Sequence, residues 1–567
     1  MEIKDFYKQF CEEGFDENGI LNHFKVTAPK DFNFAYDVVD KLAELWPDRR
    51  AMIWTNEQGE EKIFTFKDIS DYSTRAANLF AAHGVGKGDT VLLILKRNYQ
   101  FWFAILGLHK LGAIAVPATN MLTTKDVVYR MQAASIKAIV CTCQCSVHAY
   151  IDEAEKKLGV NVVKFSTMGE FPGYVDFDQE IEKQPAVMER VPVLNTDGML
   201  MYFTSGTTGQ PKMVLHGYQY PLAHIVTAVH WHNVDPDGIH LTLAETGWGK
   251  AVWGKLYGQW LAGTCVFVYD FDKFVPTDVL HMIEKYRITT FCAPPTIFRF
   301  FIKEGIANYD LSSLKYVTIA GEALNEEVFK KFKEYTGLSL MEGFGQTETT
   351  LTIANLRGNE VKPGSMGRPS PLYNIDLVDE DGNSVGEGEV GEIVVRSTRE
   401  DQHPGMFLCY YRDEESTAKA WRGGYYHTGD TAYRDEDGYF WYVGRTDDII
   451  KSSGYRIGPF EVESVLMEHP AVLECAITGA PDPIRGQVVK ATIVLTSKYT
   501  PSEELKKEIQ NFVKKTTAPY KYPRVVEFVD SLPKTISGKI RRVEIRAKDA
   551  GVEDAASRVP EKEPVTL

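Results

Sequence analysis

The chain has 567 residues, of which 44% are hydrophobic and 25% are charged, a composition typical of a globular enzyme with more than one core. Its formal net charge of -15 at pH 7 argues against nucleic acid and anionic membrane surfaces as partners, because like charges repel. No apolar run reaches the length of a membrane span, since residues 101–118 are interrupted by His109 and Lys110. Residues 1–17 resemble neither a signal peptide nor an Arg-rich transit peptide. We therefore expect a cytoplasmic protein without stable membrane insertion.

Helical and strand patterns alternate through the first 190 residues and return later in the chain. The patterns predict helices at 69–84 and 101–113, and buried strands at 90–95, 113–118, 137–143, 264–270, 288–295 and 316–324. Such alternation, with near-continuous apolar strands, predicts an α/β fold whose mostly parallel sheets are covered by helices on both faces. Ligands of such sheets bind where the strands end in loops.

Eight irregularly spaced cysteines are typical of reduced thiols rather than of a disulfide framework. Cys141, Cys143 and Cys145 alternate along an apolar run, with His148 just beyond, so the three thiols could share one face of a strand. A flat strand cannot wrap three ligands around a tetrahedral zinc ion, and zinc sites draw ligand pairs from separate segments. The pattern therefore favours small buried residues over a metal site.

Residues 202–213, YFTSGTTGQPKM, interrupt a buried-looking strand with glycines, hydroxyls and one lysine. Gly206 and Gly209 allow a sharp turn that brings backbone N–H groups close to an anion, and Lys212 adds a positive charge. The hydroxyl donors are Thr204, Ser205, Thr207 and Thr208. A Walker A loop needs four residues between its glycines and a Ser or Thr after the lysine, but here the spacing is two and Met213 follows. The loop predicts a phosphate site of another kind.

A second polar stretch, MEGFGQTETT at 341–350, carries Glu348 after Gln346 and Thr347. A single carboxylate, completed by substrate oxygens and water, commonly holds magnesium beside phosphates. The alternative for this stretch alone is a capped helix start.

Three further stretches carry charged residues beside glycines. In YYHTGD, 425–430, Asp430 follows Gly429 at an expected turn, where its carboxylate could accept both ribose hydroxyls. Residues 444–466 place Arg445, Lys451 and Arg456 around a glycine turn that leads into a helix. In LPKTISGKIRR, 532–542, Lys539 directly follows Gly538.

These five segments, in this order, resemble the adenylate-forming superfamily of acyl-CoA synthetases, nonribosomal adenylation domains and luciferases. The likeness covers almost the whole chain. It is strongest to medium-chain acyl-CoA synthetases over HPAVLECAITGAPDPIRGQVVKA at 469–491 and TAPYKYPRVVEFVDSLPKTISGKIRR at 517–542.

The resemblance implies an ATP-dependent, AMP-forming acid–thiol ligase. A carboxylate attacks the α-phosphate of ATP and expels pyrophosphate, and the CoA thiol then attacks the acyl-AMP. Lys539, Thr204 and Glu348 are implied as catalytic, with Lys539 neutralising charge at the α-phosphate and Glu348 holding Mg²⁺. The implied ATP-binding residues are Thr204, Ser205, Gly206, Thr207, Thr208, Gly209, Lys212, Gly321, Glu322, Ala323, Glu342, Gly343, Phe344, Gly345, Gln346, Thr347, Asp430, Arg445, Arg456 and Lys539.

The resemblance also implies a CoA site and a mobile domain. Ser453, Gly454 and Tyr455 would border the pantetheine tunnel, while Arg485, Lys514 and Tyr522 would meet the CoA nucleotide. A hinge at Asp447 would divide a large N-terminal region, 1–446, from a small mobile α/β domain, 447–567. Presenting Lys539 and then the 453–456 turn to one acyl-AMP site would let a single pocket run both half-reactions.

The acid is expected to be larger than acetate. Short-acid members of the superfamily place a tryptophan before the Gln-Thr-Glu triplet, whereas this chain has Gly345, so that wall is absent. Trp248 is expected to line the pocket, and Gly345→Trp to shift preference toward acetate or propionate. Lys250 and Lys255 are expected to be exposed, and the alternative is that they pair with a substrate carboxylate.

Two alternatives belong to other functional classes. A non-catalytic nucleotide-binding regulator would not need Lys539, and a carrier-loading adenylation enzyme would pass the acyl group to a phosphopantetheinyl protein. The expected partners are the carboxylic acid, ATP and CoA, and not nucleic acid. A homo-oligomer and a lysine acetyltransferase acting on Lys539 are left open.

Overall fold

The computed structural model describes residues 1–204, 210–321, 324, 326–452, 455–534 and 539–549. The chain divides into two compact units. The first comprises Met1–Thr204, Lys212–Ile375 and Val395–Tyr426, and the second contains Asp376–Val394 and the chain from His427 onward. Among the helices described, none is both long and apolar enough to cross a membrane.

An eight-stranded sheet in the first unit carries the predicted phosphate loop near one edge. In spatial order its strands are β21 (Cys409–Tyr410), β11 (Lys212–Gly217), β10 (Gly198–Thr204), β6 (Ile114–Pro117), β5 (Thr90–Ile94), β7 (Ala138–Thr142), β8 (Val163–Thr167) and β9 (Val175–Asp176). The strands from β10 to β9 pair in parallel, whereas β11 runs antiparallel to both of its neighbours. The strands predicted in the first part of the chain are thus confirmed.

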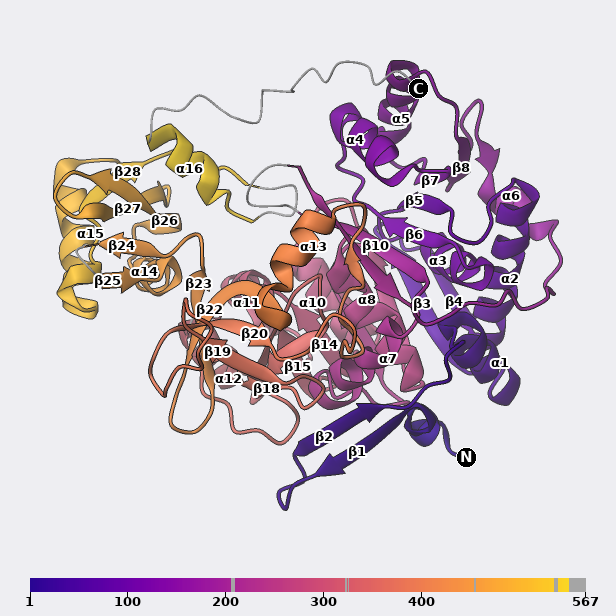
Figure 1. The fold of residues 1–567 in the computed structure, drawn as a ribbon, viewed down its shortest axis with the longest axis horizontal. Helices are drawn as coiled ribbons and strands as arrows, with labels where there is room; N and C mark the ends of the chain where they lie inside the picture. The colour runs from indigo at the N-terminus through magenta and orange to yellow at the C-terminus, as the bar shows by residue number, and fades with distance from the viewer. Residues whose placement is uncertain (205–209, 322–323, 325, 453–454, 535–538, 550–567) are drawn as a thin grey trace. The chain divides into compact units, whose positions relative to one another are not determined.

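A nine-stranded sheet in the same unit carries the second polar stretch. Its order is β18 (Arg368–Pro369), β17 (Leu351–Ala354), β16 (Leu340–Gly345), β15 (Tyr316–Ile319), β14 (Thr290–Ala293), β12 (Ile239–Thr242), β13 (Cys265–Asp270), β3 (Arg50–Asn56) and β4 (Glu61–Thr65). The six strands from β16 to β3 are parallel, and antiparallel strands close both edges. An N-terminal hairpin of β1 (Cys11–Phe15) and β2 (Leu21–Val26) stands apart from both sheets (Figure 1).

Helices cover these sheets, and two of them show why the chain folds locally as it does. Helix α2 (Phe66–Ala82) begins at a capping box in which Thr65 and Asp68 bond each other's backbone N–H. Helix α3 (Gln100–Leu111) is buried along its whole length and ends at Gly112, whose φ of 75° suits glycine. Both were predicted, with ends shifted by one to three residues. The other helices of this unit are η1 (Ile3–Phe10), η2 (Ala35–Asp40), α1 (Lys41–Leu45), α4 (Thr124–Ala134), α5 (Val147–Leu158), α6 (Phe177–Glu182), α7 (Tyr220–Ile225), η3 (Val226–Trp231), α8 (Gly249–Lys255), α9 (Tyr257–Leu261), α10 (Pro276–Lys285), α11 (Pro295–Lys303), η4 (Ile306–Asn308), α12 (Glu326–Thr336), α13 (Glu414–Ala420) and η5 (Arg422–Gly424).

Two smaller sheets build most of the second unit. One contains β19 (Ile375–Val378), β20 (Gly391–Val395), β22 (Tyr426–Arg434) and β23 (Phe440–Arg445); the other contains β25 (Tyr455–Ile457), β24 (Ile450–Ser452), β27 (Gly486–Leu495), β26 (Val472–Asp482) and β28 (Val525–Phe528). Its helices are α14 (Pro459–Leu466), α15 (Glu503–Thr516), η6 (Pro519–Lys521) and α16 (Arg542–Asp549). In chain order, α14, β26, β27, α15 and β28 form an α/β arrangement of helix, strand, strand, helix and strand.

Three local expectations were wrong. Strand β7 ends at Thr142, so Cys143 and Cys145 follow it in a turn and do not share a strand face with Cys141. Asp430 lies within β22 rather than at a turn. The capped helix start considered for residues 341–350 is also not found, because Glu342 to Phe344 lie in strand β16, which pairs with the antiparallel strand β17.

Candidate functional site

The phosphate loop connects two paired strands. Thr204 is the last residue of β10 and lies opposite Lys212, the first residue of β11, so the loop between them closes a hairpin. The Lys212 Nζ lies 4.5 Å from the centre of the Tyr410 ring, on the neighbouring strand β21. Five loop residues implied by the resemblance lie outside the described residues: Ser205, Gly206, Thr207, Thr208 and Gly209.

Strand β16 forms a second wall of the candidate ATP site. Burial raises the pKa of Glu342 to about 8, although a backbone hydrogen bond from Leu324 partly opposes this shift. Gly321 follows β15, the neighbour of β16, with a φ of 100°, and Glu322 and Ala323 lie outside the described residues. The loop that follows β16 is pinned at two points: His216 Nε2 donates to the Thr347 carbonyl at 2.8 Å, and the Tyr426 hydroxyl donates to Gln346 Oε1 at 2.8 Å.

Glu348 offers one carboxylate oxygen to a cation. The Tyr410 hydroxyl donates to its Oε1 at 2.8 Å, while no donor to its Oε2 is found in the described part of the chain. No group of three or more His, Cys, Asp or Glu side chains that could hold a metal occurs among the described residues. A cation here would therefore depend on Glu348 together with phosphate oxygens and water, which is the ligand set that Mg²⁺ takes beside nucleotides.

In the second unit, Asp430 and Arg445 lie opposite each other on β22 and β23. Arg445 Nη1 is 3.3 Å from Asp430 Oδ2 and donates to the Thr428 carbonyl at 3.1 Å. The Tyr442 hydroxyl donates to Asp430 Oδ1 at 3.0 Å. Gly429 is required beside this pair, because its φ is 71° and a Cβ there would lie 2.8 Å from Arg445 Nη2. The hairpin thus holds a buried, oriented carboxylate, as recognition of ribose hydroxyls requires.

The space beside Gly345 is filled by a residue that the sequence did not indicate. A Cβ at position 345 would lie 2.5 Å from the Trp253 ring and 2.2 Å from the Thr350 carbonyl oxygen. Even a methyl group at position 345 would therefore displace the backbone of Thr350. The substitution Gly345→Trp would strain the fold in addition to shortening the pocket. Trp248 precedes α8 and is partly exposed.

The expectation that Lys250 and Lys255 are exposed was wrong. Lys255 is 1% exposed and its Nζ donates to the Ala244 carbonyl at 2.7 Å. The Lys250 Nζ lies 4.5 Å and 5.0 Å from the ring centres of Trp231 and Trp253. Burial lowers the pKa of both lysines. Lys255 is buried because α8 packs within the core, whereas Lys250 is partly exposed as a residue and only its Nζ is enclosed.

The remaining residues implied for ATP chemistry lie on the surface of the second unit. Arg456 forms an ion pair with Glu380, and the Lys451 Nζ is 3.5 Å from the same carboxylate. Asp447 lies in the turn between β23 and β24, with an oxygen 3.7 Å from Arg445 Nε. Lys539 is exposed, next to a β-bridge between Lys534 and Ile540. The hinge and the two-domain boundary at Asp447 stay predictions.

Cations gather around Tyr522 where the resemblance implies the CoA nucleotide. The Lys514 Nζ lies 3.9 Å from the Tyr522 ring centre, and Arg524 donates to the Tyr522 hydroxyl at 2.9 Å. Backbone hydrogen bonds from Arg485 and Ile484 lower the pKa of Asp482, and the charges of Arg485 and Arg524 add to this shift. Arg524 is a further cation that sequence reasoning missed.

Tyr455 stacks on Tyr520 with ring centres 4.2 Å apart. Its implied companions in the pantetheine tunnel, Ser453 and Gly454, lie outside the described residues.

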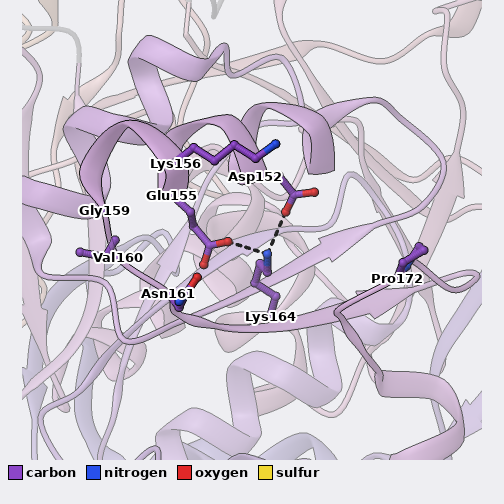
Figure 2. Close-up of a pocket in the computed structure, with 8 residues that line it drawn as sticks. All are labelled: Asp152, Glu155, Lys156, Gly159, Val160, Asn161, Lys164 and Pro172. Atoms are coloured by element: carbon purple, nitrogen blue, oxygen red, sulfur yellow. Dashed lines mark hydrogen bonds and ion pairs between the residues drawn. The ribbon is translucent and has the colours of Figure 1, made fainter.

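A surface pocket lies elsewhere in the first unit, between α5 and β8 (Figure 2). Its central Lys164 is paired with Asp152 at 2.8 Å and with Glu155 at 2.5 Å. Strand β8 is four positions from β10 in the sheet, so this pocket is separate from the phosphate loop. Its charges already neutralise one another, and we assign it no function.

Comparison with known proteins identifies relatives along the whole chain. The AMP-binding enzyme family matches residues 39–411, and the AMP-binding enzyme C-terminal domain matches 461–539. The mitochondrial acyl-coenzyme A synthetase ACSM3 of Rattus norvegicus is 39% identical over 553 residues, which cover 96% of this chain and 95% of that protein. The mitochondrial acyl-coenzyme A synthetase ACSM5 of Homo sapiens is 41% identical over 534 residues, covering 92% of this chain and 91% of that protein.

Solved structures agree with these relatives. The anthranilate CoA ligase AuaEII in complex with anthranoyl-AMP is 30% identical with a TM-score of 0.84, covering 92% of this chain and 98% of that one. A benzoate CoA ligase from Burkholderia xenovorans is 26% identical with a TM-score of 0.80, covering 91% and 100%.

The expected cytoplasmic location is contradicted, because these acyl-coenzyme A synthetase relatives are mitochondrial proteins. That expectation rested on residues 1–17, which resemble neither a signal peptide nor an Arg-rich transit peptide.

Proposed function

Because this chain belongs to the AMP-binding enzyme family and is an AMP-forming acyl-CoA synthetase, we propose that its acid is a short- to medium-chain carboxylic acid, straight or branched. The acid is activated as an acyl-AMP and then transferred to CoA. The chain-length range is supported by the likeness to medium-chain acyl-CoA synthetases, since Gly345 leaves the position before the Gln-Thr-Glu triplet without a side chain but the Trp253 ring lies beside it.

The proposed ATP site rests on one observation above the others. Lys212 and Glu348, from two motifs that are far apart in the sequence, converge on Tyr410. A cation and a carboxylate are thereby placed at the end of the phosphate-loop hairpin, where both can serve the same triphosphate. We assign Lys212 and the loop from Thr204 to the β- and γ-phosphates, and Asp430 with Arg445 to the ribose.

Glu348 is the proposed ligand of Mg²⁺, which would neutralise charge on the phosphate oxygens. Lys539 would neutralise the charge that develops at the α-phosphate, where the bond to pyrophosphate breaks as the bond to the acyl oxygen forms. The cations Arg485, Lys514 and Arg524, with Tyr522, are proposed to bind the nucleotide part of CoA. Acetylation of Lys539 and a homo-oligomer stay predictions.

The test is a panel of acids from acetate to dodecanoate, including branched acids, assayed for AMP, pyrophosphate and thioester with and without CoA. We expect thioester only when CoA is present, with the highest kcat/KM for acids longer than acetate. A best substrate of acetate would overturn the chain-length proposal. Thioester formation on a phosphopantetheinyl carrier protein but not on CoA would instead support the carrier-loading alternative.

A further inference from the structure

Tyr410 links the two motifs that are proposed to hold the phosphates and the magnesium ion, although it belongs to neither. It lies on the edge strand β21 opposite Val214 of β11, and only 7% of its surface is exposed. The Thr417 hydroxyl accepts a hydrogen bond from its backbone N–H at 3.0 Å. The backbone of Tyr410 is therefore held by both the sheet and α13.

The hydroxyl and the ring of Tyr410 contact different charged groups. Its hydroxyl donates to Glu348 Oε1 at 2.8 Å, and its ring face carries the Lys212 ammonium at 4.5 Å from the centre. The same segment also holds the backbone of Glu348, because the Phe407 N–H donates to the Glu348 carbonyl at 2.8 Å. One tyrosine thus contacts the charged groups of both motifs.

Lysine and glutamate side chains that contact the same residue can form an ion pair, in which each neutralises the charge of the other. The described residues show no ion pair between Lys212 and Glu348. Instead, Lys212 contacts the face of the Tyr410 ring, and Glu348 accepts a hydrogen bond from the Tyr410 hydroxyl. A cation over an aromatic face is held less tightly than a cation in a buried ion pair, so Lys212 stays available to phosphate.

We propose that Tyr410 is a positioning residue that keeps Lys212 and Glu348 apart and turns Glu348 Oε2 toward Mg²⁺. The inference rests on the proposed ATP site. The hydroxyl occupies Oε1 as a donor, which leaves Oε2 as the oxygen to face a divalent cation. Without the ring, Lys212 and Glu348 would pair, and magnesium and phosphate would both have to break that pair before binding.

The test separates the two ends of the side chain. Tyr410→Phe keeps the ring and removes the bond to Glu348, whereas Tyr410→Leu removes both. The neighbouring Tyr411, which is partly buried, provides the matched control Tyr411→Phe. The primary readout is ATP binding by titration calorimetry at increasing Mg²⁺ concentrations, without acid or CoA. Pyrophosphate release and the thermal unfolding midpoint are recorded in parallel.

For Tyr410→Phe we expect the Mg²⁺ concentration at half-maximal ATP binding to rise about tenfold, as is common when a partner of a metal ligand is lost. Tyr410→Leu should raise it further and also weaken ATP binding at saturating Mg²⁺, because Lys212 is then drawn to Glu348. Tyr411→Phe should match the wild type. Wild-type Mg²⁺ dependence in Tyr410→Phe would overturn the proposal, whatever its unfolding midpoint.

Failure of the proposed function looks different. A wild-type protein that does not bind ATP, or that binds it without forming thioester from any acid, would contradict the assigned activity. In the second case the Mg²⁺ dependence of the variants still decides the role of Tyr410.

Discussion

The first two predictions concern single residues. Burial raises the pKa of Glu342 from an ordinary value of 4.5 to about 8. The folded state therefore binds more protons than the unfolded chain between these pH values, so Glu342 lowers the free energy of unfolding progressively as the pH rises from 4.5 to about 8. Glu342→Gln removes this cost. We expect the variant to gain stability relative to wild type at pH 8 but not at pH 5, in denaturant titrations at both values. A gain of equal size at both pH values would contradict the buried, protonated state of Glu342.

Gly429 carries the second residue-scale prediction. Its positive φ and the nearness of Arg445 mean that Gly429→Ala strains the backbone by about 1 kcal/mol and displaces the guanidinium. Gly438, in the turn of the same hairpin, also has a positive φ of 80°, but a Cβ there would meet nothing within 4 Å. We expect Gly429→Ala to raise the KM for ATP roughly tenfold through misplaced Arg445. Gly438→Ala should cost similar stability and leave that KM unchanged; equal KM values in the two variants would refute the role of the Arg445 contact.

At the scale of elements, α8 decides the depth of the proposed acyl pocket. The Trp253 ring is the nearest side chain to the missing Cβ of Gly345, and its Nε1 donates to the Tyr220 hydroxyl at 3.2 Å. Trp253→Phe shortens the ring and should raise the kcat/KM of a longer acid relative to butyrate by roughly tenfold, the value of one or two methylenes.

The control for this prediction is Trp260→Phe on the adjacent helix α9. Trp260 is also buried and donates its Nε1 to a backbone carbonyl, that of Ala51. Both variants lose core volume, so both should unfold at lower temperature. A chain-length profile that shifts in both variants, or in neither, would show that Trp253 does not limit the pocket.

At the scale of the whole molecule, the prediction concerns the two half-reactions. If the second unit presents Lys539 for the first and the 453–456 turn for the second, Lys539→Ala should lower acyl-AMP formation by orders of magnitude. Thioester formation from synthetic acyl-AMP and CoA should survive. Acetylation of Lys539 removes the same charge and should act in the same way.

Gly454→Leu should show the reverse pattern, since a side chain in the pantetheine tunnel obstructs CoA but not ATP. Pyrophosphate release and thioester formation are measured separately on both variants. Equal losses in both steps for Lys539→Ala would contradict the two-conformation proposal.

The helices, the strands and the class of ligand were predicted from signals that lie within short segments of the sequence. The apolar runs of β5, β7 and β13, the glycine that ends α3 and the loop between Thr204 and Lys212 are each encoded within a few neighbouring residues. Such signals do not depend on what packs against them, which is why the parallel sheets were predicted correctly, whereas phosphate binding by the loop stays a prediction.

Which side chains contact one another depends on how distant segments of the chain pack. Tyr410, Trp253 and Tyr442 have no distinguishing local pattern, and each gains its place by strand pairing or helix packing with segments far away in the chain. The burial of Lys255 was missed for the same reason, since a lysine on a short helix is ordinarily exposed and is buried here only because α8 lies inside the core. Contact and burial are set by the register and packing of distant elements, and neither can be read from the spacing of residues along one segment.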